Sequence, residues 1–308
     1  METSAPVRAV VGPTAAGKSD LAVAVALVLA GAGRPVEVVN ADSMQLYRGM
    51  DVGTAKLSPA ERSGVPHHLL DVLDVTDAAT VAEFQAWARA AVADCHARGV
   101  VPLLVGGSAL YVRAVLDAFE FPGTDPDLRA SLEAELADLG PAALHARLAA
   151  ADPAAAAAIL PTNGRRVVRA LEVGALTGQP YAAGLPELRH VYDDVRVVGV
   201  DVPREVLDAR IEARVDRMWA AGLVAEVETL TGLGLAGSRT ASRALGYAQV
   251  LDALAGRCSL DEARDATVRR TRKFARRQDS WFRKDPRITW LPHDAPDLLE
   301  RAVAVLAP

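Results

Sequence analysis

The sequence predicts an α/β protein built on a parallel sheet with flanking helices and a helical insertion. Residues 12–19 form a G-x-x-x-x-G-K-[ST] motif between an apolar run and an Ala-, Leu- and Val-rich stretch, which predicts strand, glycine-rich turn and helix. Short apolar runs alternate with helical stretches up to about residue 119, as in sheets covered on both faces. Residues 125–176 carry only helical signals. We therefore predict a P-loop NTPase-like core interrupted by helices.

The apolar runs and helical spacings predict the elements in order. Strands are expected at 7–11, 36–39, 100–105 and 195–200, and helices at 18–30 and 81–98. The helix at 81–98 should carry Phe84, Trp87, Ala91 and Cys95 on one side. Breaks in the helical block are expected at 140–141, 152–153 and 161–164, and helix should dominate from 200 to 304. The predicted domains are a first core part at 1–119, the helical insertion at 120–190 and the completed core at 191–308.

Composition narrows the class of protein. The chain has 308 residues, a formal net charge of -5 and only two cysteines, Cys95 and Cys258, far apart. These cysteines exclude a disulfide framework and a Cys-rich zinc site, and they fit a reducing cytoplasm. The first residues lack a secretory signal, and the longest apolar run, 21–33, is too short to span a bilayer. We expect a cytoplasmic enzyme with no membrane partner.

The glycine-rich motif predicts a phosphate site. Its backbone N–H groups and the following helix dipole attract phosphate oxygens. Lys18 supplies a point charge, and the Ser19 hydroxyl is placed to bind Mg²⁺. The predicted phosphate-binding residues are Gly12, Pro13, Thr14, Ala15, Ala16, Gly17, Lys18 and Ser19. The motif leaves open which phosphate ester binds.

Two further strand ends carry polar residues that should meet the phosphate loop. Asp42 and Gln45 follow the strand at 36–39, and Gly106-Gly107-Ser108 follows the strand at 100–105. Ligands of parallel sheets bind at the carboxyl ends of the strands, so we expect one cleft. Asp42 could bind Mg²⁺, act as a general base or merely cap the next turn. Gln45 could read a base edge or be a solvated side chain.

A basic segment lies near the C-terminus. Residues 264–287 contain ten Lys or Arg and three acids, a net charge of +7 within an acidic chain. Arg269, Lys273 and Arg276 share a predicted helical face, and Phe274 and Trp281 could anchor this helix. Such an excess favours a polyanion partner over a plain solvated face.

Three classes of function remain possible at this point. A P-loop kinase or ATPase is one, although the strand at 100–105 ends in Gly-Gly and not in an acid. A non-catalytic RNA-binding module is another. The third follows from a resemblance. Residues 12–19, 40–56, 65–71, 106–111, 165–173, 210–218, 244–247 and 272–283 resemble, in order, the tRNA dimethylallyltransferase (tRNA isopentenylpyrophosphate transferase) family, bacterial type.

The resemblance implies a reaction and roles for residues. A dimethylallyl group passes from dimethylallyl diphosphate to N6 of the adenosine 3′-adjacent to the tRNA anticodon, and diphosphate leaves. The residue matching Asp42 is the general base, Thr14, Lys18, Ser19 and Mg²⁺ stabilise the leaving group, and Arg214, preferred here over Arg210, binds the diphosphate.

The resemblance also implies the tRNA contacts. The helical insertion grips the anticodon stem-loop, and the protein is expected to be a monomer. The contact residues implied are Asp42, Ser43, Met44, Gln45, Ser108, Arg129, Arg165, Arg166, Arg169, Arg243, Gly246, Tyr247, Arg272, Lys273, Arg276 and Arg277. The chain departs from the family at Ala109, at Asn163-Gly164 and at Ala248, where a basic or polar side chain is common.

Overall fold

A parallel sheet organises the core of the computed structural model, which describes residues 6–181 and 187–307. Within those ranges the sheet has six strands in the order β3-β2-β4-β1-β5-β6, and every neighbouring pair is parallel. The strands are β1 (Pro6–Val11), β2 (Val36–Asn40), β3 (His67–His68), β4 (Val101–Gly106), β5 (Asp194–Asp201) and β6 (Ile288–Pro292). The predicted parallel α/β core is confirmed.

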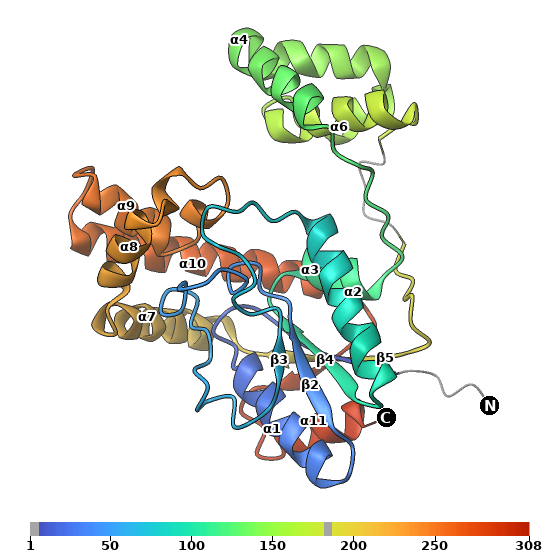
Figure 1. The fold of residues 1–308 in the computed structure, drawn as a ribbon, viewed down its shortest axis with the longest axis vertical. Helices are drawn as coiled ribbons and strands as arrows, with labels where there is room; N and C mark the ends of the chain where they lie inside the picture. Colours follow the sequence, from blue (N-terminus) through green and yellow to red (C-terminus); the bar gives the residue numbers. More distant parts are fainter. Residues whose placement is uncertain (1–5, 182–186, 308) are drawn as a thin grey trace. The chain divides into compact units, whose positions relative to one another are not determined.

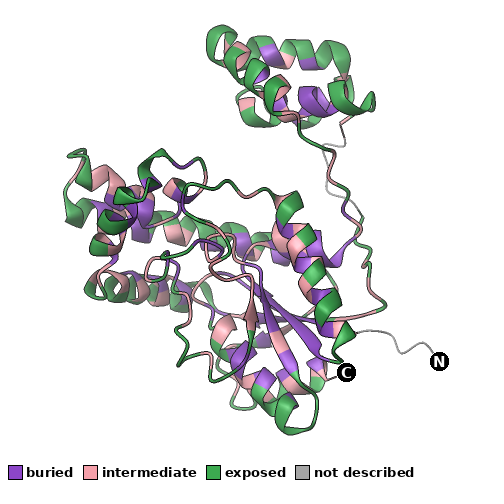
Figure 2. Ribbon diagram, in the orientation of Figure 1, coloured by how far each residue is buried: buried purple, intermediate pink, exposed green. Residues whose placement is uncertain are grey.

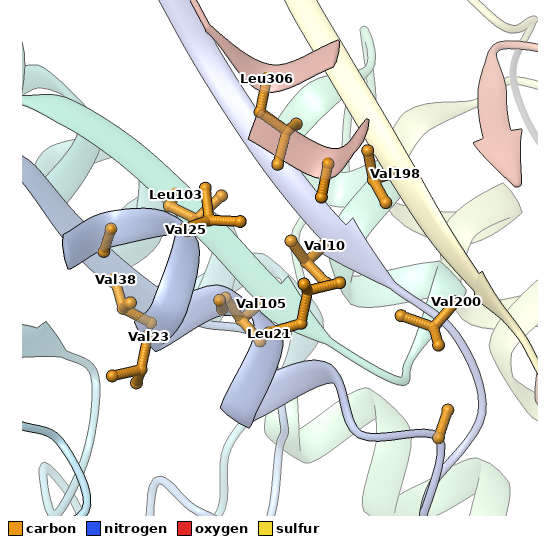
Figure 3. Packing of buried hydrophobic residues seen from close by; sticks show 14 of the residues in the cluster. Val10, Leu21, Val23, Val25, Val38, Leu103, Val105, Val198, Val200 and Leu306 are labelled. Carbon is orange, nitrogen blue, oxygen red and sulfur yellow. The ribbon is translucent and has the colours of Figure 1, made fainter. Parts of the chain in front are cut away.

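Apolar side chains on both faces explain why the strands are continuous hydrophobic runs. On one face Val10, Leu103 and Val198 pack against α1 (Lys18–Gly31) and α11 (Leu298–Leu306), as Figure 3 shows. On the other face the alternate strand residues pack against α2 (Val81–Ala97) and α3 (Ala109–Leu116). Figure 2 shows the strands as the most continuously buried segments of this core. Helices on both faces leave the strand ends as the place for a ligand.

Helix α2 packs one side against the sheet. Its buried residues are Phe84, Ala88, Val92 and Cys95, whereas Trp87 and Ala91 are only half-buried. Phe84 and Cys95 of the predicted side thus lie in the core, and Ala91 packs against the same cluster while only partly buried. Strands β3 and β6 were missed: β3 has only two residues, and β6 lies in the part of the chain that was expected to be mainly helical.

The second half of the core is mainly helical, as predicted. It contains α7 (Arg204–Ala220), α8 (Leu223–Gly232), α9 (Tyr247–Leu254) and α10 (Leu260–Phe282), with short 3₁₀ turns at 235–237 and 241–243. Figure 1 shows these helices in orange, close to one another, and contacts join α7 to α10 and α10 to α9. The cluster of Tyr47, Leu223, Val227 and Tyr247 connects α8 and α9 to the loop after β2.

The chain divides into two compact units, one made of residues 1–117 and 190–308 and the other of Ala118–Arg189. The second unit consists of α4 (Pro126–Ala151), α5 (Pro153–Ala158) and α6 (Gly164–Thr177). Gly140 has a φ of 79° and kinks α4, and the Asp152 side chain accepts from Ala155 N–H to cap α5. Both features lie where the sequence predicts breaks in the helical block, at 140–141 and at 152–153.

Candidate active site

The phosphate loop connects β1 to α1 through a backbone that only small residues allow. Gly17 has a φ of 91° at the start of α1, and Ala15 a φ of 63°. Gly12 has a φ of 143°, and a Cβ there would lie 3.3 Å from the Val200 carbonyl oxygen of β5. The turn therefore needs glycine at Gly12 and Gly17 and presents backbone N–H groups at the start of α1.

Lys18 lies folded over this loop. Its Nζ donates to the Pro13 carbonyl at 2.7 Å. Burial and, to a smaller extent, the nearby Arg214 guanidinium lower the pKa of Lys18 to about 8, although Asp42 opposes both effects. Burial likewise lowers the pKa of Arg214, again opposed by Asp42. Two partly desolvated cations beside a single carboxylate form a site that favours an added anion.

The three strand ends meet at one cavity, as predicted. This small cavity, of about 100 Å³, is lined by the phosphate loop after β1, Asp42 after β2 and Gly106-Gly107 at the end of β4. Lys18, Ser19 and Arg214 also line it. A Cβ on Gly106 would lie 2.5 Å from the Ala41 carbonyl oxygen, so the glycine is required for β4 to end beside β2.

Asp42 caps the turn that follows it and also lines the small cavity. Its Oδ1 accepts from Met44 N–H at 2.9 Å, which is the turn cap. The residue also lines the small cavity, and Oδ2 has no hydrogen-bond partner in residues 6–181 and 187–307. Capping therefore orients the carboxylate and leaves one oxygen available to a ligand. Gln45 is not merely solvated, because its Nε2 donates to the Thr54 carbonyl at 3.2 Å.

A larger cavity, of about 420 Å³, adjoins the small one and shares Thr14, Asp42 and Arg214 with it. Much of its lining is apolar: Ile211, Val215, Met218, Ala244, Leu245 and Phe274. Six residues expected to touch tRNA also line it, namely Asp42, Ser43, Met44, Ser108, Arg243 and Arg277. Thr14, Asp42 and Arg214, three of the five residues that line both cavities, thus lie where a phosphate-sized space opens into an apolar one.

Gln278 of α10 is a site residue to which the sequence analysis assigned no role. Its Oε1 accepts from Thr14 N–H of the phosphate loop at 2.9 Å, and a Cβ on Gly107 would lie 2.6 Å from its Nε2. Gln278 is 8% exposed and lines both cavities. Its place directly after the basic pair Arg276-Arg277 was the only available signal.

The basic charge of α10 is partly neutralised by α7. Three ion pairs join the helices: Arg264–Asp216, Arg272–Glu212 and Arg276–Asp208. The acids recur every four residues, on one face of α7. Less of the positive charge of residues 264–287 is therefore available to a polyanion partner than the composition indicates. Lys273 and Arg277 are exposed and have no carboxylate partner in the described ranges.

Phe274 and Trp281 do not anchor α10. They are 36% and 42% exposed, whereas Ala275 and Phe282 of the same helix are buried. The anchor prediction was wrong because α10 packs through the small Ala275 and the neighbouring Phe282. Phe274 lines both cavities instead.

Tyr247 and Gly246 are buried and do not suit a contact with RNA. The Tyr247 side chain is fully buried, and its hydroxyl donates to Glu226 at 2.5 Å. We therefore revise its predicted role from tRNA contact to structural support.

In the helical unit, Arg129 and Arg169 both pair with Glu172, whose side chain is completely buried. The charges on these two arginines are thus compensated locally. Arg165 and Arg166 at the start of α6 are exposed.

Oxygen ligands suited to Mg²⁺ are present at the small cavity in the Ser19 hydroxyl and the Asp42 carboxylate. A separate group of Glu37, His68 and Cys95 also brings three ligand atoms within 4.8 Å of one another. There, however, Arg98 donates to both oxygens of Glu37, which makes the group an ion-pair cluster.

No helix of the described residues is both long and apolar enough to cross a membrane.

Comparison with known proteins shows which family this chain is similar to. The family model for IPP transferase matches residues 45–285. The tRNA dimethylallyltransferase of Kineococcus radiotolerans is 68% identical over 99% of this chain and 96% of its own length. That of Thermobifida fusca is 64% identical over 97% of this chain and 93% of its own length.

Solved structures similar to this chain point to the same family. The Bacillus halodurans tRNA isopentenylpyrophosphate transferase aligns with a TM-score of 0.71 and 40% identity over 98% of this chain and 96% of its own. A eukaryotic dimethylallyltransferase solved acting on tRNA aligns with a TM-score of 0.84 and 25% identity, covering 98% of this chain and 78% of its own.

Proposed function

The chain belongs to the tRNA dimethylallyltransferase family, and from that premise we propose how its own residues carry out the transfer. The reaction moves a dimethylallyl group from dimethylallyl diphosphate to N6 of the adenosine 3′-adjacent to the anticodon. The observation that carries the proposal is the pair of adjoining cavities that share Thr14, Asp42 and Arg214. The small cationic cavity suits a diphosphate, and the larger, apolar one suits a prenyl group and an unstacked base.

The leaving diphosphate would lie against the phosphate loop. Loop N–H groups, protonated Lys18 and the Arg214 guanidinium converge on the small cavity, where burial strengthens their interaction with an anion. Charge builds on the diphosphate as the allylic bond ionises, so these groups bind the transition state more tightly than the ground state. Thr14, shared by both cavities, would donate its hydroxyl to the oxygen that bridges phosphorus and carbon.

Asp42 would remove the N6 proton. An adenine amine is a weak nucleophile, and a carboxylate with one oxygen already held by Met44 N–H presents its other oxygen to the cavity in a fixed orientation. The proton passes to that oxygen as the N6–carbon bond forms and the carbon–oxygen bond breaks.

Mg²⁺ fits the same cavity, because the Ser19 hydroxyl there supplies a hard oxygen ligand of the kind that the ion prefers. When bound, the ion would neutralise diphosphate charge. Ser19 is the residue of the phosphate loop that would hold it.

The tRNA anticodon stem-loop would meet the exposed cations of both units. Candidates are Lys273 and Arg277 on α10, Arg243 at the larger cavity, and Arg165 with Arg166 on α6. The target adenosine must leave its stack to enter the cavity, as with other enzymes that modify a base. We place the protein, as a monomer, in the cytoplasm with its tRNA substrate.

The test uses purified protein, dimethylallyl diphosphate, Mg²⁺ and unmodified tRNA, with nucleoside mass spectrometry as the readout. We expect isoprenylated adenosine from the wild type and from Asp74→Asn, an exposed control outside both cavities. Asp42→Asn should lose about 100-fold or more in turnover and retain tRNA binding. Near-normal turnover by Asp42→Asn would remove Asp42 as the base. Lys18-dependent ATP hydrolysis without prenyl transfer would favour the kinase alternative.

A further inference from the structure

Glu226, on α8, holds the loop after β2 through an unusually complete set of hydrogen bonds. Its Oε2 accepts from the N–H groups of Asp51 at 3.0 Å and Val52 at 2.7 Å. Its Oε1 accepts from Gly53 N–H at 3.1 Å and from the Tyr247 hydroxyl at 2.5 Å. Four donors occupy all four acceptor positions of one carboxylate, an arrangement that only the ionised side chain can make.

The surroundings leave this loop little freedom. Tyr247 is fully buried. Burial, and to a smaller extent the negative charge of the adjacent Glu226, raises the pKa of its phenol, so the hydroxyl remains protonated and can donate. A Cβ on Gly53 would lie 2.4 Å from the Tyr247 ring and 2.8 Å from Leu223. The backbone at Gly53 is therefore pressed against α8 and α9 with no room for a side chain.

The next residue of the loop contacts the reaction site. The Thr54 carbonyl accepts from Arg214 Nη2 at 3.0 Å and from Gln45 Nε2 at 3.2 Å. The Thr54 hydroxyl donates to Met50 O at 2.6 Å, which closes the loop on itself. The Thr54 carbonyl thus orients both Arg214, which is proposed to bind the diphosphate, and Gln45, which lines the small cavity.

We propose that Glu226 is a positioning residue for the transfer reaction, acting through the Thr54 carbonyl on Arg214. The role of Arg214 rests on the function proposed above. Glu226 itself lines neither of the two cavities, so it acts only through the loop. If the carboxylate is lost, the three loop N–H groups lose their acceptor, Thr54 shifts, and Arg214 no longer reaches the diphosphate in the right geometry.

The test compares Glu226→Gln with Glu228→Gln. Glutamine keeps the size of the side chain but places an NH₂ group against N–H donors, whereas Glu228 is an exposed glutamate two residues along the same helix. We expect Glu226→Gln to weaken the binding of inorganic diphosphate and to lower kcat/KM for dimethylallyl diphosphate about 100-fold, as misplacement by about 1 Å does. The Kd for tRNA and the behaviour of Glu228→Gln should match the wild type.

A double-mutant cycle shows whether Glu226 acts through Arg214. In an Arg214→Ala background, Glu226→Gln should cost almost nothing more, because the residue that it positions is already gone. Fully additive losses would overturn the proposal and leave Glu226 a structural residue. Wild-type diphosphate affinity in folded Glu226→Gln would also overturn it.

A milder variant keeps the test decisive if Glu226→Gln does not fold. Tyr247→Phe removes one of the four donors and keeps the buried ring, so we expect a loss of about tenfold in kcat/KM with unchanged tRNA affinity. No change in Tyr247→Phe would then count against the proposal. Absence of prenylated adenosine with the wild type would overturn the proposed function alone, since the diphosphate-binding comparison needs no turnover.

Discussion

Lys18 makes the affinity for dimethylallyl diphosphate depend on pH, because its pKa is lowered to about 8. Burial and the Arg214 charge lower the pKa of its amine from 10.5 to about 8 in the free protein. The bound diphosphate favours the protonated amine and raises this pKa again. Above pH 8 the protein must therefore take up a proton to bind, and its affinity falls as the pH rises.

The size of the effect follows from the two pKa values. The difference between 10.5 and about 8 corresponds to about 3 kcal/mol in favour of the neutral amine. With a pKa of about 8, most Lys18 is protonated at pH 7 and about 3% at pH 9.5. We therefore expect the Kd for dimethylallyl diphosphate to rise about 30-fold between pH 7 and pH 9.5.

Isothermal titration calorimetry without tRNA measures this dependence. Lys18→Met serves as the control, because a neutral side chain should bind weakly at pH 7 and show almost no change up to pH 9.5. Proton uptake on binding, seen as a dependence of the binding heat on the buffer, should appear above pH 8 for the wild type only. A wild-type Kd that stays constant from pH 7 to pH 9.5 would refute the lowered pKa of Lys18.

Three further predictions concern other charges. Arg214→Ala should lower kcat/KM for dimethylallyl diphosphate about 100-fold and leave the tRNA Kd unchanged, which steady-state kinetics and filter binding check. Arg277→Ala should weaken tRNA binding and reduce the dependence of log Kd on log salt concentration by about 1. Asp208→Asn releases Arg276 from its ion pair and should strengthen tRNA binding. Salt titrations in which the two variants changed the tRNA affinity in the same direction would contradict this. Glu172→Gln leaves two arginines without their buried partner and should destabilise the helical unit by about 3 kcal/mol, seen as faster hydrogen exchange confined to residues 118–189.

Local patterns were enough to predict β1, β2, β4 and β5 and the edge of the sheet at which their polar residues meet. The glycine-rich motif at 12–19 depends on backbone conformations that neighbouring residues impose, so it can be recognised from sequence. The position of Asp42 and of Gly106-Gly107 directly after apolar strands then predicts that they meet, because parallel strands bring their carboxyl ends to one edge.

Elements without a local signal were missed or misjudged. Strand β3 has only two residues and exists because it pairs with β2. The charge of α10 was counted correctly from the sequence, but its pairing with α7 was not foreseen, since no sequence spacing shows that these helices pack together. Tyr247 was mistaken for an RNA contact because an aromatic beside glycine has the same pattern whether exposed or buried.

The sequence by itself determined a strand, a glycine-rich turn and a helix at the edge of a parallel sheet, because these signals are short-range. Only the tertiary structure decided which distant groups hold that site in shape. Gln278 reaches Thr14 from 264 positions away, and Glu226 holds the loop that orients Arg214. A single hydrogen bond between distant residues leaves no periodic trace in the sequence, and it forms only when the packed helices bring its two partners together.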